Sequence, residues 1–358
     1  MIWMPLEIIP KKALGIDIGT SSIKVVELSR RGERRKLENY GEIASQVLYE
    51  RPFRTFEKSS LLLSTQDISR AIKAVLEEAK IRTKRVIFSI PDFSTFFTSF
   101  DLPPMTKEEL PQAIRYEASH YVPIPLAEVT LDWQVIEGHI SNQEKVGLKI
   151  LLVAVPNEVI NQYKEISKLS GLKLLALEAE VFGLLRSLIG EQKETILLID
   201  IGAQSTTCSI VEKKVLKMSY SFDMSGNELT EVISKGMGVD YKTAESLKEK
   251  YGILSSTSQE SPAVDVKQIL IPLIDVIIKE TERILRSFNQ IVPQKIIIAG
   301  ASAFLPGLKE YFQDCFKKEV ITTNPFSNLF FPPILETILK EMGPAYAIAI
   351  GVALRGLE

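Results

Sequence analysis

The chain has 358 residues, 45% hydrophobic and 25% charged, a composition typical of a soluble globular protein too long for one ordinary core. Its net charge of −2 gives no reason to expect bulk attraction to nucleic acid or to a membrane. Two cysteines and two histidines argue against a disulfide framework and a zinc site, and fit a reducing compartment. No apolar run approaches the ~20 residues of a membrane span, so we predict no transmembrane segment.

The first predicted element is a hairpin of two apolar strands, 13–18 and 23–29. Its first strand ends in Asp17, and its turn holds Gly19 and the hydroxyl residues Thr20, Ser21 and Ser22. Glycine lets a backbone approach a ligand closely, and turn amides and hydroxyls suit phosphate oxygens. A carboxylate would repel phosphate, so we expect Asp17 to bind Mg²⁺, through water.

The remaining elements of the first lobe lie on both sides of an insertion. We assign residues 13–93 and 171–190 to this lobe and residues 94–170 to the inserted module. Before the module we predict a strand at 36–44, a loop at 50–63, a helix opening at residue 65 and a buried strand at 85–90. After it we predict a strand at 173–177 and a helix at 179–188.

The inserted module has the predicted order β-α-β-β-α, with no catalytic constellation. Thr106 is the expected N-cap of its first helix. The module is rich in aromatic residues, of which those outside the core suit the gripping of an apolar peptide. Its predicted strands are 96–102, 129–136 and 148–155, and its predicted helices are 107–120 and 158–170.

A second copy of the phosphate-loop pattern begins 183 residues after the first. Here Asp200 and Gly202 precede the hydroxyl residues Ser205 and Thr206. A single copy fits an ordinary hairpin with nothing bound. Two copies in like settings predict a duplicated fold with two phosphate loops that face one cleft.

The second lobe is predicted to consist of a core, 191–225 and 293–358, and a helical subdomain, 226–292. The core strands are expected at 195–200, 205–212, 215–222, 295–299 and 320–323. The helices are expected at 227–236, 241–251, 269–292, 308–316 and 343–356, with a flexible loop at 254–264.

The order of these motifs resembles the actin, sugar-kinase and Hsp70 ATPase fold, an α/β fold of two lobes. In that fold a third motif, here Gly300-Ala301-Ser302 after a strand, holds the adenosine. The resemblance also implies adenosine contacts for Glu245 and Lys248, and a close nucleotide approach at Gly226. Glu245 and Lys248 share one helix face, a spacing that an ordinary exposed ion pair also produces.

Within this superfamily the chain most resembles the PilM family of type IV pilus assembly proteins and, more distantly, FtsA. The resemblance rests on residues 14–28, on the inserted module and on residues 347–355. The module itself resembles a 1C or SHS2-like domain. The family resemblance implies ATP and Mg²⁺ between the lobes, with Asp17 and Asp200 flanking the metal and phosphates. It also implies a groove near residues 94–170 for the cytoplasmic N-terminal segment of a PilN-like inner-membrane protein, and hence a cytoplasmic location at that membrane.

Turnover of ATP is a weaker expectation than binding. Glu180 is the best-placed carboxylate to orient an attacking water, although a glutamate at a helix N-terminus is also favoured by the helix dipole. Lys24 fits either a phosphate contact or a solvated strand position. Two departures from the family pattern concern binding: Ala301 replaces a second glycine, and Ala203-Gln204 replace a hydroxyl.

Alternative functions stay open at this point. One is a small-molecule phosphotransferase of the sugar or acyl kinase type, which needs an Asp base over a substrate pocket; no convincing base is evident. Another is an FtsA-like cell-division filament protein, but FtsA ends in an amphipathic membrane helix, whereas this sequence stops just after the last family motif. Self-association is compatible with the sequence.

Overall fold

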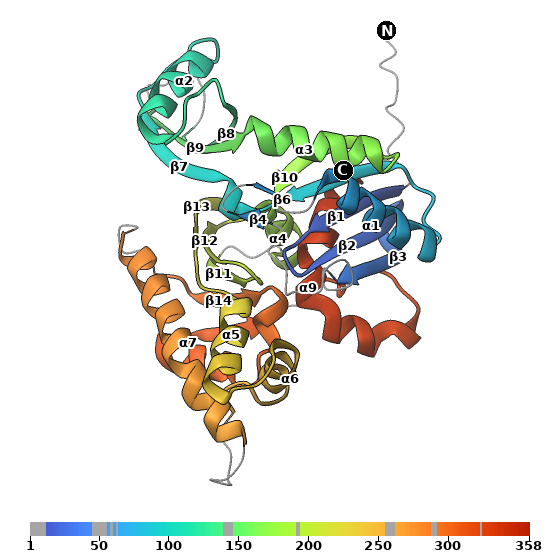
Figure 1. Cartoon of the computed structure of the whole chain (residues 1–358). Coiled ribbons are helices and arrows are strands. Elements are labelled where there is room, and N and C mark those ends of the chain that lie inside the picture. Colours follow the sequence, from blue (N-terminus) through green and yellow to red (C-terminus); the bar gives the residue numbers. More distant parts are fainter. Residues whose placement is uncertain are drawn as a thin grey trace.

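The computed structural model describes residues 12–44, 56–57, 60–61, 64–138, 146–190, 194–254, 262–287, 292–322 and 324–358. These residues form two lobes, with a smaller module attached to the first (Figure 1).

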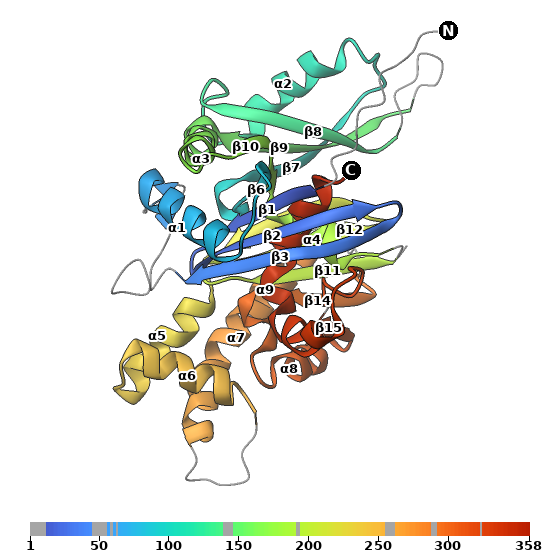
Figure 2. The same cartoon turned by 90° about the vertical axis from the view of Figure 1, so that its right-hand side faces the viewer.

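The first lobe is built on a mixed five-stranded sheet. Three antiparallel strands form a meander, and two further strands run parallel to the first of them, in the order β10-β6-β1-β2-β3. Figure 2 shows the long β1, β2 and β3 side by side. The strands are β1 (Lys12–Ile18), β2 (Ser22–Arg31), β3 (Arg34–Ala44), β6 (Arg85–Ile90) and β10 (Lys173–Ala179).

The second lobe repeats this sheet strand for strand, in the order β13-β12-β11-β14-β15. In the first hairpin Asp17 pairs with Lys24, and in the second Asp200 pairs with Thr207. The predicted duplication is therefore confirmed, with both aspartates at the same place in their sheets. The strands are β11 (Thr195–Ile201), β12 (Thr206–Glu212), β13 (Val215–Phe222), β14 (Lys295–Ala299) and β15 (Glu319–Thr322).

Two helices, α4 (Glu180–Leu188) and α9 (Glu336–Arg355), pack closely together and join the lobes. A Cβ on Gly351 would lie 1.9 Å from the Gly183 carbonyl oxygen, so only glycine allows this crossing. The helical segment Pro333–Arg355, which contains α9, is long and apolar enough to cross a membrane by length and composition, but 61% of its apolar window is buried inside the protein. Its buried residues pack on β1 and β2, as a core helix does.

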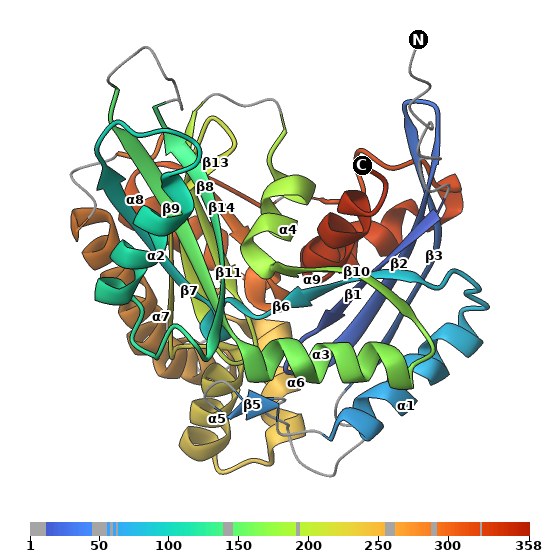
Figure 3. The ribbon, with the colours of Figure 1, turned by 90° about the horizontal axis from the view of Figure 1, so that it is seen from above.

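The inserted module has the predicted element order. Its antiparallel sheet runs β7-β9-β8, with α2 near its outer end and α3 beside α1 (Figure 3). Tyr163 of α3 is fully buried, and its ring meets that of Phe88 on β6. The elements are α1 (Thr65–Glu78), β7 (Phe96–Leu102), α2 (Leu110–Tyr121), β8 (Val129–Glu137), β9 (Leu148–Pro156) and α3 (Asn157–Leu169).

The helical part of the second lobe packs on one face of its sheet through a continuous apolar core. It contains α5 (Gly226–Met237), α6 (Tyr241–Tyr251) and α7 (Pro262–Ser287), and α8 (Leu308–Phe316) follows β14.

Three predicted helix starts and one predicted loop were wrong. Helix α2 begins at Leu110 rather than at 107, because Thr106 and the Glu109 carboxylate form a separate turn before it. Helix α9 begins at Glu336 rather than at 343, since Pro344 lies inside the helix without ending it. Helix α7 begins at Pro262, inside the predicted loop, and its described part ends at Ser287. The predicted loop 50–63 contains the short strands β4 (Phe56–Glu57) and β5 (Ser60–Leu61); its other residues lie outside the described part.

Candidate functional site

The two phosphate-loop turns face each other across a small cavity of about 70 Å³. The Thr20 hydroxyl donates to Gln204 Oε1 at 3.2 Å, so the two lobes touch at this point. The predicted site residues on this wall are Asp17, Gly19, Thr20, Ser21, Lys24, Glu180, Asp200, Gly202, Ser205, Gly300 and Ala301.

A second cavity, of about 300 Å³, adjoins the first and shares Ser21, Ala203 and Ala301 with it. Its size and its partly apolar wall suit a nucleoside. The predicted residues on this wall are Ser21, Gly226, Glu245, Lys248, Ala301 and Ser302.

Lys248 is a buried residue of α6 whose ammonium links this helix to α5 by hydrogen bonds. Its ammonium donates to the Gly226 carbonyl oxygen at 3.0 Å and to the Thr230 hydroxyl at 2.7 Å, and it pairs with Glu245 at 2.7 Å. A Cβ on Gly226 would lie 2.6 Å from Ser302 Oγ, so glycine permits this packing. The first two amides of α5 donate to carbonyl oxygens of the second turn, those of Gly202 and Ala203. These two amides are therefore engaged by the protein itself.

Carboxyl groups gather around the smaller cavity. Burial raises the pKa of Asp17, against the opposing effects of Lys24 and of a 2.7 Å hydrogen bond from Ser89. Burial and then the charge of Asp17 raise the pKa of Asp200 to about 7. Burial and the surrounding aspartates raise the pKa of Glu180 well above its ordinary value. A site that concentrates negative charge in this way favours a cation.

Asp92 belongs to this acidic group and was not predicted. Its carboxylate accepts the Val181 amide at the start of α4, and its own amide donates to the Glu180 carboxylate. Burial raises its pKa to about 8. The available signal was its place just after β6, since the carboxyl ends of β1, β6 and β10 meet at one edge of the sheet.

Two predicted residues do not reach the cavity walls. Ser22 is buried, and its hydroxyl accepts the Lys24 ammonium at 2.6 Å, so it positions that lysine. Thr206 is fully buried and donates to the Met224 carbonyl oxygen at 2.6 Å, which is a structural role. Thr207 lines the cavity in its place. Other wall residues that the sequence did not single out are Phe93, Asn227, Glu249, Phe304, Leu305, Glu341, Pro344, Ala345 and Ile348.

The donor set fits Mg²⁺ held together with phosphates better than a cation held by the protein alone. Within the described residues no group of three or more His, Cys, Asp or Glu side chains is arranged to hold a metal ion. The buried Asp200 Oδ1 has no hydrogen-bond partner there, so one lone-pair site is open. Mg²⁺ is commonly bound through one or two carboxylates plus waters and substrate phosphates, and Asp17 and Asp200 supply that number.

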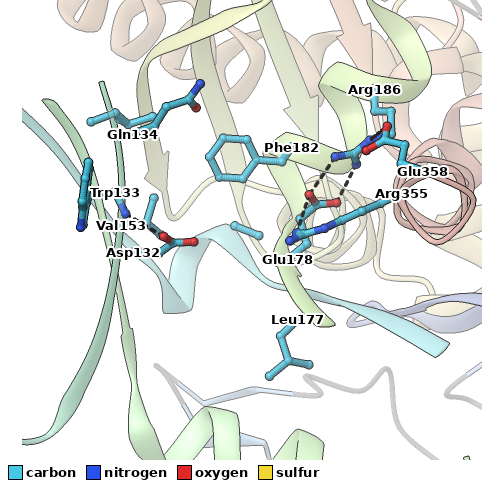
Figure 4. A pocket seen from close by; sticks show the side chains of 12 residues that line it. Asp132, Trp133, Gln134, Val153, Leu177, Glu178, Phe182, Arg186, Arg355 and Glu358 are labelled. Atoms are coloured by element: carbon cyan, nitrogen blue, oxygen red, sulfur yellow. Dashed lines mark hydrogen bonds and ion pairs between the residues drawn. The ribbon is translucent and has the colours of Figure 1, made fainter. Parts of the chain in front are cut away.

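A separate groove of about 480 Å³ lies between the module and the first lobe (Figure 4). One wall is β8 and β9 of the module, with Asp132 and Trp133. The other wall is an ionic cluster in which Glu178 accepts from Arg186 at 2.7 and 3.0 Å and from Arg355 at 2.8 Å. Phe182 of α4 lies between the two walls.

Two repeated sheets, two facing phosphate loops and an adjoining nucleoside-sized cavity define the class: the chain has the actin-like ATPase fold. Solved structures agree on this fold, among them MreB5 of Spiroplasma citri bound to ADP, at 13% identity, with a TM-score of 0.60 and 96% and 95% of the two chains covered.

The family is more specific. A family model for type IV pilus assembly protein PilM matches residues 15–357, so the chain belongs to that family. A solved PilM–PilN type IV pilus biogenesis complex matches with a TM-score of 0.85 and 26% identity, covering 98% of this chain and 100% of that one. The cell division protein FtsA of Enterococcus faecalis is 24% identical over 347 residues, covering 86% of this chain and 77% of that protein.

Proposed function

We propose that this protein is an ATP-binding scaffold of type IV pilus assembly that holds a short segment of a PilN-like partner. The proposal that the protein binds a nucleotide rests on the two adjoining cavities. The larger cavity fits a nucleoside, and the smaller one places two carboxylates between two hydroxyl-rich turns. Neighbours of the same fold are bound to ADP or AMPPNP.

In this proposal the adenosine occupies the larger cavity and the phosphates enter the smaller one. Glu245, Lys248 and Ser302 line the adenosine side. Ala301 replaces glycine there without backbone strain, because it is not among the described residues with positive φ. Gly300 cannot be replaced in this way: its φ is +88°, and a Cβ would lie 2.5 Å from Asp200 Oδ1.

Asp17 and Asp200 would hold Mg²⁺ from opposite lobes, and Lys24 would neutralise phosphate charge. Bound Mg²⁺ supplies charge stabilisation for the phosphates. Glu180 is the residue that we assign to orient a water, since its carboxyl lines the smaller cavity and is fixed by the Asp92 amide. Burial raises the pKa of Glu180 well above its ordinary value, which disfavours the ionised carboxylate that would activate a water, so we assign binding rather than turnover as the main role.

The test is calorimetric binding of ATP·Mg²⁺ to the wild type and to Asp17→Ala and Asp200→Ala. We expect at least about a tenfold weaker affinity for each variant, because each removes a charged metal partner. Asp223→Ala, which changes an exposed aspartate of the same lobe as Asp200, is the matched control. Wild-type affinity in both site variants would contradict the assignment of the nucleotide site. Rapid ATP turnover stimulated by a small hydroxyl compound would instead favour a phosphotransferase.

The partner part of the proposal rests on the groove. We assign residues 94–170 as the unit that grips the N-terminal cytoplasmic segment of a PilN-like inner-membrane protein against the first lobe. Strands β8 and β10 are edge strands of their sheets, and edge strands can pair with an extended peptide. This contact would keep the protein at the cytoplasmic face of the inner membrane.

The groove is tested with a synthetic peptide of the partner's N-terminal segment and fluorescence anisotropy. Phe182→Ala and Arg355→Ala each change a groove side chain, and we expect each to weaken binding by about tenfold or more. Tyr116→Ala removes an aromatic ring of the inserted module that is 66% exposed and lies outside the groove, so this variant should bind as the wild type does. Equal loss in all three variants would show that the effect is not specific to the groove and would contradict the assignment.

A further inference from the structure

The end of the first-lobe sheet opposite the nucleotide cavities is strongly basic. Every strand of this sheet has a cation there: Lys12, Arg31, Arg34, Arg85 and Lys173, all exposed. Four strand spacings of about 4.8 Å make this edge roughly 20 Å wide. We call it the basic edge and define it as residues 30–36 and 80–85 together with Lys12 and Lys173.

The sequence of the basic edge is unbalanced in charge. Residues 30–36 contain five basic residues and one acidic residue, and residues 80–85 contain four basic residues and no acidic one. Within the described part of the chain, only three of the cations at this edge make ion pairs: Lys12 with Glu27, Arg30 with Glu33, and Lys36 with Glu38. The remaining cations have no carboxylate partner among those residues.

The β2–β3 hairpin places like charges directly opposite each other. Arg30 pairs across the strands with Arg35, and Arg31 with Arg34. Such pairs destabilise a hairpin unless an anion lies over them. The equivalent hairpin of the second lobe pairs Glu212 with Val215 and has no such conflict. The repulsion is therefore particular to the first lobe, and the fold does not require it.

We propose that the basic edge binds an anionic phospholipid bilayer directly, independently of nucleotide and of the partner peptide. Clusters of four to eight Lys and Arg residues bind anionic headgroups through the surface potential of the membrane. The opposite end of this sheet carries the acidic group of Asp17, Asp92 and Glu180, so the lobe is polarised along its strands. The field of an anionic bilayer would turn the nucleotide cavities away from the membrane.

A bilayer fits this edge better than a single-stranded nucleic acid. Residues 30–36 and 80–85 contain no aromatic side chain, and single-stranded nucleic acid is bound by stacking on aromatic rings. In the sequence, residues 1–11 precede Lys12 and contain apolar residues that include Trp3, Ile8 and Ile9. Figure 3 shows the closed end of the β2–β3 hairpin projecting beyond the neighbouring strands of the sheet.

The test is co-sedimentation of the full-length protein with phosphatidylcholine vesicles, with and without phosphatidylglycerol. We expect binding only to the vesicles that contain phosphatidylglycerol, and loss of that binding at about 1 M salt, where charges are screened within roughly 3 Å. Each basic residue strengthens such binding by about fivefold. Arg31→Glu/Arg34→Glu/Arg35→Glu should therefore weaken it by about a hundredfold or more.

The matched control is Lys213→Glu/Lys309→Glu/Lys317→Glu, which makes the same charge change at exposed lysines of the second lobe. It should retain most of the binding, and both triple variants should bind ATP·Mg²⁺ as the wild type does, which shows that they are folded. Equal losses in the two variants would mean that net charge alone acts, and the proposal would fail.

Two further experiments test nucleic acid as a competing ligand and a variant without the N-terminal residues. Preference for a DNA or RNA duplex over phosphatidylglycerol vesicles would overturn the proposal in favour of a nucleic-acid site. A variant that lacks residues 1–10 should keep salt-sensitive binding to phosphatidylglycerol. Complete loss in that variant, with no effect of the arginine reversals, would assign binding to the apolar segment and contradict the basic edge.

Discussion

The carboxyl groups of Asp17 and Asp200 could be assigned from the sequence because a short glycine turn follows each of them and the pattern occurs twice. Asp92 has no such turn after it, and only the parallel alignment of β6 with β1 brings it to Glu180. Ser22 and Thr206 were assigned to the phosphate site because they are hydroxyl residues of the two loops. The strand geometry instead directs one hydroxyl to Lys24 and the other to a backbone carbonyl.

The buried Asp92 carboxyl makes the stability of the nucleotide-free protein depend on pH. Its folded-state pKa of about 8 lies above the ordinary value of 3.8, so the folded state retains a proton that the unfolded state has released. The free energy of unfolding should therefore fall as pH rises from about 4 to about 8 and stay level above that range.

Asp92→Asn tests this effect, because it keeps an oxygen for the Val181 amide and removes the charge. We expect the variant to be more stable than the wild type at pH 9 by about 1–3 kcal/mol and to differ less at pH 5. Urea unfolding in EDTA at the two pH values is the measurement. An identical pH dependence in the two proteins would show that Asp92 is not the titrating group.

Lys248 is a second residue with a measurable structural role. Lys248→Met retains the apolar stem but removes the donor shared by the Gly226 carbonyl and the Thr230 hydroxyl. We expect a loss of about 1–3 kcal/mol in the free energy of unfolding and weaker ATP binding. Lys250→Met changes an exposed lysine of the same helix and should do neither. Chemical denaturation measures the stability of both variants, and calorimetry measures their affinity for ATP.

At the scale of elements, most strands and helices could be predicted because their apolar periodicity is local. The start of α9 could not, since Gly343 and Pro344 are usually helix-breaking signals, whereas here they lie inside a buried helix. The crossing of α4 and α9 also could not be predicted from the sequence, because it depends on two glycines, Gly183 and Gly351, that are far apart in the chain.

Gly351→Ala should disrupt that crossing. The added methyl group would lie 1.9 Å from the Gly183 carbonyl oxygen, so the helices must separate. We expect a loss of about 1–3 kcal/mol in the free energy of unfolding, as for an overpacked core. Gly190→Ala is the control, since a methyl group added there would have no atom within 4 Å beyond its chain neighbours. Thermal unfolding of both variants measures the difference, and equal midpoints would contradict the close packing.

At the scale of the whole molecule, the sequence predicted two lobes and an inserted module from the repeat and the motif order. It did not predict the groove's walls or the basic edge. The composition averages to a net charge of −2, so it conceals two basic stretches, 30–36 and 80–85, that the sheet brings to one edge with Lys12 and Lys173.

ATP·Mg²⁺ should stabilise the whole molecule, because the cavities that we assign to it have walls from both lobes. At a free ligand concentration about 100 times the Kd, binding adds about 2.7 kcal/mol to the free energy of unfolding. We expect the unfolding midpoint of the wild type to rise by several degrees and that of Asp200→Ala to stay nearly constant. Differential scanning calorimetry with and without ligand provides the comparison.

The repeated strand order of the two sheets has a consequence for how such a site could have arisen. Asp17 and Asp200 occupy equivalent positions in the two sheets and face each other across the smaller cavity, so each lobe supplies half of one binding site. Two identical copies of a single ancestral lobe, related by a twofold axis, would form the same cavity as a dimer. Fusion of the two copies would free each half to diverge, as at the position paired with the aspartate, which is Lys24 in the first hairpin and Thr207 in the second.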